Sequence, residues 1–402
     1  KWLKDLALDQ FENGIVPYVI PHVLDDSVSS GSAGWADAAT IIPWQMYRAY
    51  GDLQLLADQY PSMKAWVDYM RRESINDLWK PRKRQIGDWL SYIPPSFLDV
   101  SKSAHTDMYL IAQCFFAHST ALVVKAAQVL GRDEDVVGYS ALLERIRKAF
   151  SDEYVTPNGS LVSNTQTAYL LALNFDLLAG DQTTNAVKKL VENINDYGRH
   201  LTTGFLGTPY LCAVLTRYGH LDLAYELLLR EDYPSWLYPV TLGATTIWER
   251  WDGVRPDGSF QNPDMNSFNH YAYGAIGNWM YTTIAGILSD SVQVGYKKSI
   301  IKPKPGGGLT YAKASLDTYY GKLVSNWNII NGQFHLDVEI PPNTTATIYL
   351  PVPEIDLVEE NGKGLLRRPD LKSVNIIDGE IVVEIGAGKY SFLVKNENYA
   401  KN

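Results

Sequence analysis

The sequence predicts a mainly α-helical protein, an (α/α)6 barrel of six helical hairpins whose first hairpin is missing, followed by a C-terminal antiparallel β-sandwich. Three observations predict this fold. Helical periodicity dominates residues 1–289, and the helical segments come in pairs joined by similar glycine turns. From residue 290 to residue 402 apolar and polar residues alternate instead, as in half-buried strands. We therefore expect two domains, 1–289 and 290–402, in a chain of 402 residues.

The helical pairs turn at Gly51, Gly131 and Gly219. In each pair a glycine follows the first helix, where a left-handed residue is needed, and an aspartate lies within the next few positions to start the second helix. About ten helices are predicted, at 1–13, 34–50, 52–72, 104–130, 133–152, 163–178, 183–197, 205–218, 220–231 and 268–287. A closed (α/α)6 barrel needs twelve, so we expect one hairpin to be missing before residue 1.

The strands of the second domain are predicted from alternation and from turn residues. The stretches KLVSNWNIINGQFHLDVEI, TTATIYLPV and IVVEIGAGKYSFLV alternate apolar and polar positions, with the turn sequences NG, PPN and GAG between or within them. The segment KPKPGGGLT is predicted to be a loop.

Composition narrows the classes of function. The chain carries a net charge of −9 and contains 26 Tyr and 11 Trp, which argues against nucleic acid and anionic membranes as partners and suggests a neutral, flat ligand. No run of eighteen apolar residues predicts a membrane helix. Cys114 and Cys212 are expected to be buried free thiols rather than a disulfide, and no metal or cofactor is predicted, because no His/Cys cluster, HExxH, GxSxG or phosphate-binding glycine loop occurs. Localisation and oligomeric state are not predicted beyond a preference for the cytoplasm, unless an upstream signal directs secretion.

Four loop stretches combine tryptophan with a carboxylate or a histidine, and each lies at a junction between helices. They are SSGSAGWADAA at 29–39 with Trp35 and Asp37, QIGDWLSY at 85–92 with Asp88 and Trp89, TTIWERWDG at 245–253 with Trp248, Glu249 and Trp251, and FNHYAYGAIGNW at 268–279 with His270. Sugars stack their C–H faces on aromatic rings, and glycoside hydrolysis needs carboxylates around the anomeric carbon. The four stretches therefore favour a glycosidase.

Three of the four stretches also have a structural interpretation, which the sequence leaves open. Glu249 could form a buried ion pair with Arg250, with the flanking tryptophans packing in the core. Asp37 could cap a helix, with Trp35 packing beside it, and His270 could be a capping or core residue at the start of the last helix.

The four ordered motifs, together with the opening helix KWLKDLALDQFENGIVPYVIPHV and the later stretch IIKPKPGGGLTYAKASLDTYYG, resemble bacterial α-L-rhamnosidases of glycoside hydrolase family 78 across essentially the whole chain. The resemblance implies that Glu249 is the general base of an inverting hydrolysis. It implies that Trp35 and Trp89 line the rhamnose pocket, that Trp248 and Trp251 complete the wall around the base, and that His270 bonds a sugar hydroxyl. Asp37 and Asp88 are further candidates for binding the sugar.

The sequence departs from the family at the general acid. The family's acid motif, Asp-x-x-Arg-x-Glu-Arg-x-Gly-Trp, does not occur here. We therefore expect rhamnose-containing glycosides or polysaccharides as ligands, and negligible hydrolysis by this chain alone. Two alternatives stay open: a catalytically inactive carbohydrate-binding homologue or fragment, and a six-hairpin glycosidase of other sugar specificity in which Asp37 or Asp88 is the acid.

Overall fold

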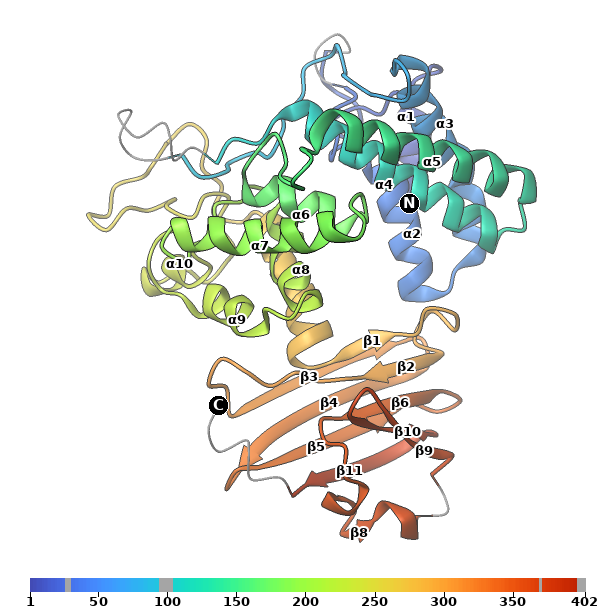
Figure 1. The fold of residues 1–402 in the computed structure, drawn as a ribbon, viewed down its shortest axis with the longest axis vertical. Coiled ribbons are helices and arrows are strands. Elements are labelled where there is room, and N and C mark those ends of the chain that lie inside the picture. The colour runs from blue at the N-terminus through green and yellow to red at the C-terminus, as the bar shows by residue number, and fades with distance from the viewer. Residues whose placement is uncertain (26–29, 94–103, 369–370, 396–402) are drawn as a thin grey trace. The chain divides into compact units, whose positions relative to one another are not determined.

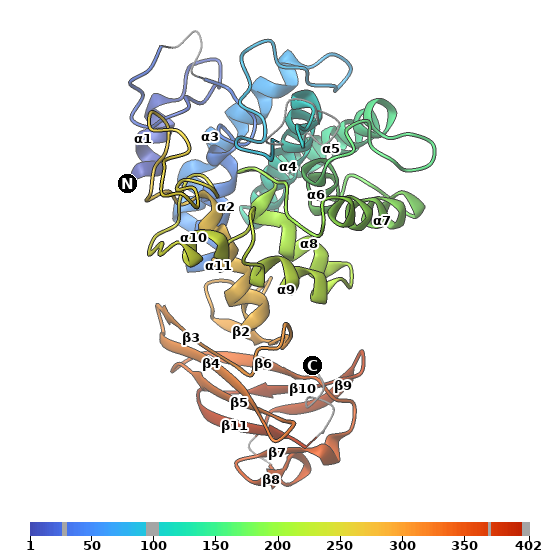
Figure 2. The ribbon, with the colours of Figure 1, turned by 90° about the vertical axis from the view of Figure 1, so that its left-hand side faces the viewer.

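A computed structural model describes residues 1–25, 30–93, 104–368 and 371–395 (Figures 1 and 2). The backbone divides into two compact units, a helical one of residues 1–45 and 53–275 and a second one of residues 46–52 and 276–402. Ser29, at the start of the first singled-out stretch, and residues 369–370 and 396–402 of the predicted β-domain lie outside the described residues. The predicted boundary at 289/290 stays a prediction.

The helical unit is built from hairpins in chain order. Its helices are α1 (Trp2–Asp9), α2 (Ala38–Tyr50, whose last turn belongs to the second unit), α3 (Leu53–Glu73), α4 (Met108–Val129), α5 (Asp133–Tyr154), α6 (Gln166–Asn174), α7 (Asp181–Asp196), α8 (Leu211–Arg217), α9 (Leu221–Leu229) and α10 (Leu237–Thr241). Short 3₁₀ turns add η2 (Thr208–Tyr210) and η3 (Ala272–Ala275).

Inner and outer helices differ in how they are buried. Every residue of α6 from Gln166 to Leu173 is buried, whereas α7 buries only one face. A helix that is buried all round lies inside other helices, and a helix with one apolar face covers them. Helices α4, α6 and α8 pack on one another in sequence and on their hairpin partners α5, α7 and α9. This alternation of inner and outer helices confirms the predicted fold class.

Helix α4 is long and apolar enough to span a membrane by length and composition, and no other described helix is. However, 83% of its most apolar window is buried inside the structure. Burial of that extent is typical of a core helix.

The predicted hairpin turns are confirmed, although the aspartates act differently from the prediction. Gly51, Gly131 and Gly219 have φ of +69°, +64° and +85°, in the left-handed region that glycine enters without strain. Asp133 and Asp222 lie in the first turns of α5 and α9, whose N-cap residues make no side-chain capping bond. Their charges therefore favour the helices through the dipole rather than as caps.

The helices differ from the prediction in three places. The predicted helix 205–218 is α-helical only over α8, after a turn at 205–207 and η2. The predicted helix 268–287 is broken: residues 268–271 are not helical, and η3, α11 (Ile276–Trp279) and the π-helical turn η4 (Met280–Ile284) follow in succession. Helix α10 was not predicted, because a five-residue helix is too short to establish a helical period.

The second unit contains two sheets. One has the order β1-β2-β6-β10-β9 and the other β3-β4-β5-β11-β7-β8. The strands are β1 (Ile287–Ser289), β2 (Lys298–Ile301), β3 (Tyr311–Thr318), β4 (Gly321–Ile330), β5 (Gln333–Ile340), β6 (Thr345–Leu350), β7 (Val358–Glu360), β8 (Lys363–Gly364), β9 (Ser373–Ile377), β10 (Glu380–Ile385) and β11 (Gly388–Val394).

Strand pairing is antiparallel except between β2 and β6, which run parallel. The exception arises because β3, β4 and β5 lie between these strands in sequence and belong to the other sheet. Asn331 and Gly332, both with positive φ, form the predicted NG turn between β4 and β5, and KPKPGGGLT lies in the strand-free connection from β2 to β3. Trp327 of β4 is 1% exposed and donates its indole N–H to the carbonyl of Ile284 at 2.7 Å.

Candidate functional site

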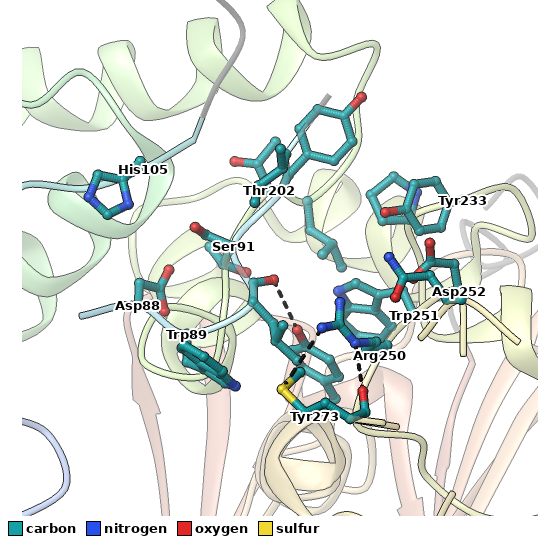
Figure 3. A pocket seen from close by; sticks show the side chains of 18 of the residues that line it. Asp88, Trp89, Ser91, His105, Thr202, Tyr233, Arg250, Trp251, Asp252 and Tyr273 are labelled. Carbon is teal, nitrogen blue, oxygen red and sulfur yellow. Dashed lines mark hydrogen bonds between the residues drawn. The ribbon is translucent and has the colours of Figure 1, made fainter. Parts of the chain in front are cut away.

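A cavity of about 830 Å³ lies within the helical unit (Figure 3). Its wall comes from loops rather than helices, chiefly residues 86–93, 201–203 and 250–252. Of the predicted site residues, Asp88, Trp89 and Trp251 line this cavity. The other five, Trp35, Asp37, Trp248, Glu249 and His270, are not among its lining residues.

Asp88 organises the loop opposite it. One carboxylate oxygen accepts hydrogen bonds from the hydroxyl of Thr167 at 2.5 Å and the amide of Gly204 at 2.8 Å. The other accepts from the amides of Leu206 and Gly207, at 2.7 and 3.1 Å. Burial raises the pKa of Asp88, and these hydrogen bonds oppose the rise. With both oxygens occupied, Asp88 is built to position a loop rather than to contact a ligand.

The loop bonded by Asp88, residues 204–207, joins several of the predicted stretches. The amide of Phe205 donates to the carbonyl of Trp89 at 2.9 Å, and the Phe205 ring lies 5.0 Å from that of His270 and 5.2 Å from that of Tyr273. A Cβ at Gly204 would lie 2.2 Å from the Trp89 carbonyl oxygen, so only glycine allows this approach. A Cβ at Gly34 would meet Leu206 at 2.5 Å, which places the first stretch against the same loop.

Aromatic rings form one wall of the cavity. Trp251 stacks on Tyr273 with ring centroids 3.8 Å apart, and Trp236 meets Trp251 edge-on at 5.6 Å. Trp236 donates its indole N–H to the Tyr273 carbonyl at 3.0 Å. Trp89, at 36% exposed, presents its indole at the cavity, on a segment far from this cluster in sequence (Figure 3).

Arg250 and Asp252 also line the cavity, on either side of Trp251. Arg250 donates through Nε to the carbonyl of Met265 at 3.1 Å, and it forms no ion pair with Glu249 in the part of the chain that the structure describes. The ion-pair interpretation of the TTIWERWDG stretch is therefore wrong. Burial raises the pKa of Asp252, and Arg250 and Arg255 oppose the rise.

Glu249 is half-buried between these cavity residues and a neighbouring segment. Its carboxylate Oε2 accepts the amide of Ser267 at 2.9 Å, and its own amide donates to the Ser267 carbonyl at 2.8 Å. The amide of His270 donates to the carbonyl of Ile247 at 2.9 Å, so a third hydrogen bond joins the same two segments. The third and fourth singled-out stretches therefore run side by side.

Trp248 and His270 lie in the two paired segments, and Trp35 lies in a different part of the chain. Trp248 is 7% exposed and packs edge-on against Phe268 at 5.2 Å. His270 is half-buried and lies two residues before the helical turn η3, so its predicted position at the start of a helix was wrong by two residues. Trp35 is half-buried in the turn before α2.

Asp37 is a buried structural carboxylate in this fold. It is fully buried and accepts hydrogen bonds from Trp66 Nε1 at 2.9 Å, Gly34 N at 2.7 Å and the Ser119 hydroxyl. Burial raises its pKa to about 6, against these hydrogen bonds. Asp37 directly precedes α2, as the capping interpretation expects, but its side chain bonds the preceding turn rather than the first helical amides.

Several lining residues were missed in the sequence, among them Thr202, Thr203, Tyr233, Arg255, Gln261 and Tyr273. The signal that could have pointed to the first two is TTGFLGT at 202–208, whose threonines and glycines overlap the start of the helix predicted at 205–218. Arg255 and Gln261 lie in a long connection without periodicity. No group of three or more His, Cys, Asp or Glu side chains within the described ranges could hold a metal ion.

Comparison with protein families gives two consecutive matches. Residues 1–284 match the bacterial alpha-L-rhamnosidase 6 hairpin glycosidase domain, and residues 286–365 match the bacterial alpha-L-rhamnosidase C-terminal domain. Among curated proteins, an alpha-L-rhamnosidase of Streptomyces avermitilis is 42% identical over 98% of this chain and 36% of its own length. An alpha-L-rhamnosidase of Formosa agariphila is 41% identical over 98% of this chain and 42% of its own length.

Solved structures give the same relationship. The crystal structure of the Streptomyces avermitilis alpha-L-rhamnosidase complexed with L-rhamnose superposes with a TM-score of 0.88 at 41% identity, covering 98% of this chain and 36% of that one. The alpha-L-rhamnosidase of Aspergillus terreus gives a TM-score of 0.85 at 33% identity, covering 98% and 42%. This chain thus spans well under half the length of these relatives.

Proposed function

Because this chain belongs to the bacterial α-L-rhamnosidase six-hairpin glycosidase family, we propose that the protein hydrolyses terminal, non-reducing α-L-rhamnose residues from glycosides or polysaccharides. The observation that carries the proposal is the setting of Glu249. The Ser267 amide holds Oε2, while Oε1 accepts no hydrogen bond from the described residues. A carboxylate fixed through one oxygen, with the other free, is suited to take a proton from water.

We propose an inverting mechanism in which Glu249 is the general base. Such a reaction needs a second carboxyl group as the acid, about 6.5–9.5 Å from the base, so that water fits between the base and the anomeric carbon. Asp37 and Asp88 are poor candidates for this acid, because each is buried and its carboxylate is engaged by several protein donors. Neither aspartate is therefore proposed as the acid, and the family's acid motif does not occur in this sequence.

The sugar pocket in this proposal is the aromatic surface near Glu249. Trp35 and Trp89 stack on rhamnose, Trp248 and Trp251 wall the base, and His270 bonds a hydroxyl. The 36% exposure of the Trp89 side chain supports its part, and His270 is half-buried beside Phe205. The contacts of Asp88 and Asp37 support an indirect part, in which they hold the loops that carry the pocket. Residues 1–289 are then the catalytic barrel and 290–402 a separate β-domain.

The proposal is tested by following hydrolysis of an aryl α-L-rhamnoside by NMR in the protein that carries this chain. The first-formed rhamnose should be the β-anomer. Release of the α-anomer would overturn the inverting mechanism. Rhamnose binding without any turnover would instead support the inactive carbohydrate-binding alternative, and turnover of glucosides or uronides in place of rhamnosides would support a different sugar specificity.

A further inference from the structure

Two guanidinium groups line the cavity without a carboxylate partner. Arg250 donates to the carbonyl and, at 3.9 Å, to the sulfur of Met265, and Arg255 donates to the carbonyl of Gln261 at 3.3 Å. Neither arginine has an ion pair within 4.0 Å in the part of the chain that the structure describes. Arginine side chains that line a binding site commonly engage a carboxylate, phosphate or sulfate group of a ligand.

The carboxylates of the cavity do not neutralise these arginines by contact. Both oxygens of Asp88 already accept two hydrogen bonds each from Thr167 and the 204–207 loop. Asp252 lies near enough to feel both arginines, yet it pairs with neither of them within 4.0 Å. The guanidinium groups therefore keep their capacity to bond an anion from outside.

Three buried polar atoms of lining residues also lack a hydrogen-bond partner among the described residues. They are Thr202 Oγ1, Trp251 Nε1 and Gln261 Oε1. The indole N–H can only donate, the amide oxygen can only accept, and the hydroxyl can do both. A group that offers donors and acceptors together satisfies all three, and sugar hydroxyls are such groups. The exposed indole of Trp89, which the proposed function places against the rhamnose, lines the same cavity, so the neighbouring sugar unit can lie next to the rhamnose.

We propose that this cavity binds an acidic sugar, namely the unit to which the rhamnose is attached, with its carboxylate or sulfate facing Arg250 and Arg255 and its hydroxyls facing Thr202, Trp251 and Gln261. The inference rests on the proposed function, which places the rhamnose beside Glu249. Rhamnose carries no charge, so an anionic group has to come from the neighbouring unit. The protein would then select rhamnose that caps an acidic saccharide.

The test compares kcat/KM for four disaccharides in which rhamnose is joined to galacturonate, to its methyl ester, to galactose 6-sulfate and to galactose. In the wild-type protein we expect a charged substrate to be preferred, and the preference to weaken as ionic strength rises. Arg255→Gln should lower kcat/KM on the preferred charged substrate by about tenfold or more, the scale of a lost charge-assisted hydrogen bond, and leave the ester and galactose unchanged. Whether carboxylate or sulfate is preferred identifies the anionic group.

Arg71→Gln is the matched control, because it removes an exposed arginine of α3 outside the cavity lining. It should change none of the four values. Equal turnover of charged and neutral substrates by the wild-type protein, or an equal loss on all four in Arg255→Gln, would overturn the acidic-sugar site. If the wild-type protein hydrolyses none of the four disaccharides, the proposed function fails, and the acidic-sugar site is then tested by calorimetry. Binding of the galacturonate disaccharide but not of its methyl ester, lost in Arg255→Gln, would support the site. Equal binding of the two disaccharides would overturn it.

Discussion

Trp251 and Tyr273 lie face to face, with ring centroids 3.8 Å apart and planes inclined by 16°. The stack joins the stretch that carries Glu249 to the segment that follows His270, and both rings line the cavity. Tyr273 is 1% exposed, and its hydroxyl donates to the carbonyl of Leu90 at 3.3 Å. The wall beside the proposed base is therefore fixed by one ring stack and one hydrogen bond, which join three separate segments of the chain.

Glu249→Gln should lower kcat on aryl α-L-rhamnosides by about 10²–10⁴-fold or more while leaving rhamnose affinity nearly unchanged, because the amide keeps the shape of the side chain but cannot take a proton. Steady-state kinetics and rhamnose calorimetry on the same preparation measure both quantities. Glu231→Gln, at an exposed glutamate outside the cavity lining, is the control. Turnover close to that of the wild-type protein would remove Glu249 from the mechanism.

Trp89→Ala should weaken rhamnose binding by about 1–3 kcal/mol, since a stacked indole loses its apolar contact with the sugar. Its 36% exposure predicts a small change in melting temperature. Trp79→Ala, at a fully buried tryptophan, should instead cost about 3–5 kcal/mol of stability. A large drop in melting temperature for Trp89→Ala, with unchanged affinity in the protein that remains folded, would identify Trp89 as a packing residue.

Asp37 should make the free energy of unfolding fall as pH rises from about 4 to about 6. Its pKa is about 6 in the folded protein and 3.8 ordinarily, so the folded state binds the proton more tightly across this window and loses that advantage as pH rises. The change is about 3 kcal/mol. Chemical denaturation of the wild-type protein and of Asp37→Asn at several pH values measures the contribution of Asp37 to the free energy of unfolding. Parallel stability curves for the two proteins would show that Asp37 does not titrate in this range.

Gly204→Ala should reduce both stability and rhamnoside turnover, because the new Cβ would lie 2.2 Å from the Trp89 carbonyl oxygen and force the two loops apart. Gly138→Ala offers a contrast: it lies within helix α5, and a Cβ there meets nothing within 4 Å. The second change should stabilise the protein by up to about 1 kcal/mol. Thermal melting and rhamnoside kinetics are measured for both variants. A Gly204→Ala protein with the melting temperature and turnover of the wild-type protein would show that the two loops can separate without cost.

The hairpin fold was predictable because its signals are local. Gly51, Gly131 and Gly219 mark their turns through a backbone conformation that glycine alone adopts easily, and the strand alternation follows from one buried face. The parallel pairing of β2 with β6 was not predictable, because it depends on which sheet the intervening strands join. Local patterns contain no information about that choice.

The site was predictable only in part, for the same reason. Trp and carboxylate together in a loop pointed to Asp88 and Asp37, but the donors that occupy these carboxylates come from distant segments such as Thr167, Gly204 and Ser119. Whether a carboxylate faces a ligand or holds a loop is decided by those long-range contacts. The segments at 202–203 and 255–261 have no helical or strand pattern of their own. Their place in the lining of the cavity becomes visible only in the folded chain.

In the loop that Asp88 holds, residues 204–207, the path of the backbone does not depend on which side chain stands at position 205. The carboxylate bonds main-chain amides at 204, 206 and 207, and none of these bonds depends on the side chain at position 205. Phe205, whose ring lies 5.0 Å from that of His270, can therefore be exchanged while the loop keeps its path. Because the proposed function has His270 bond a sugar hydroxyl, a change at position 205 is expected to alter how the sugar is held while the loop keeps its path.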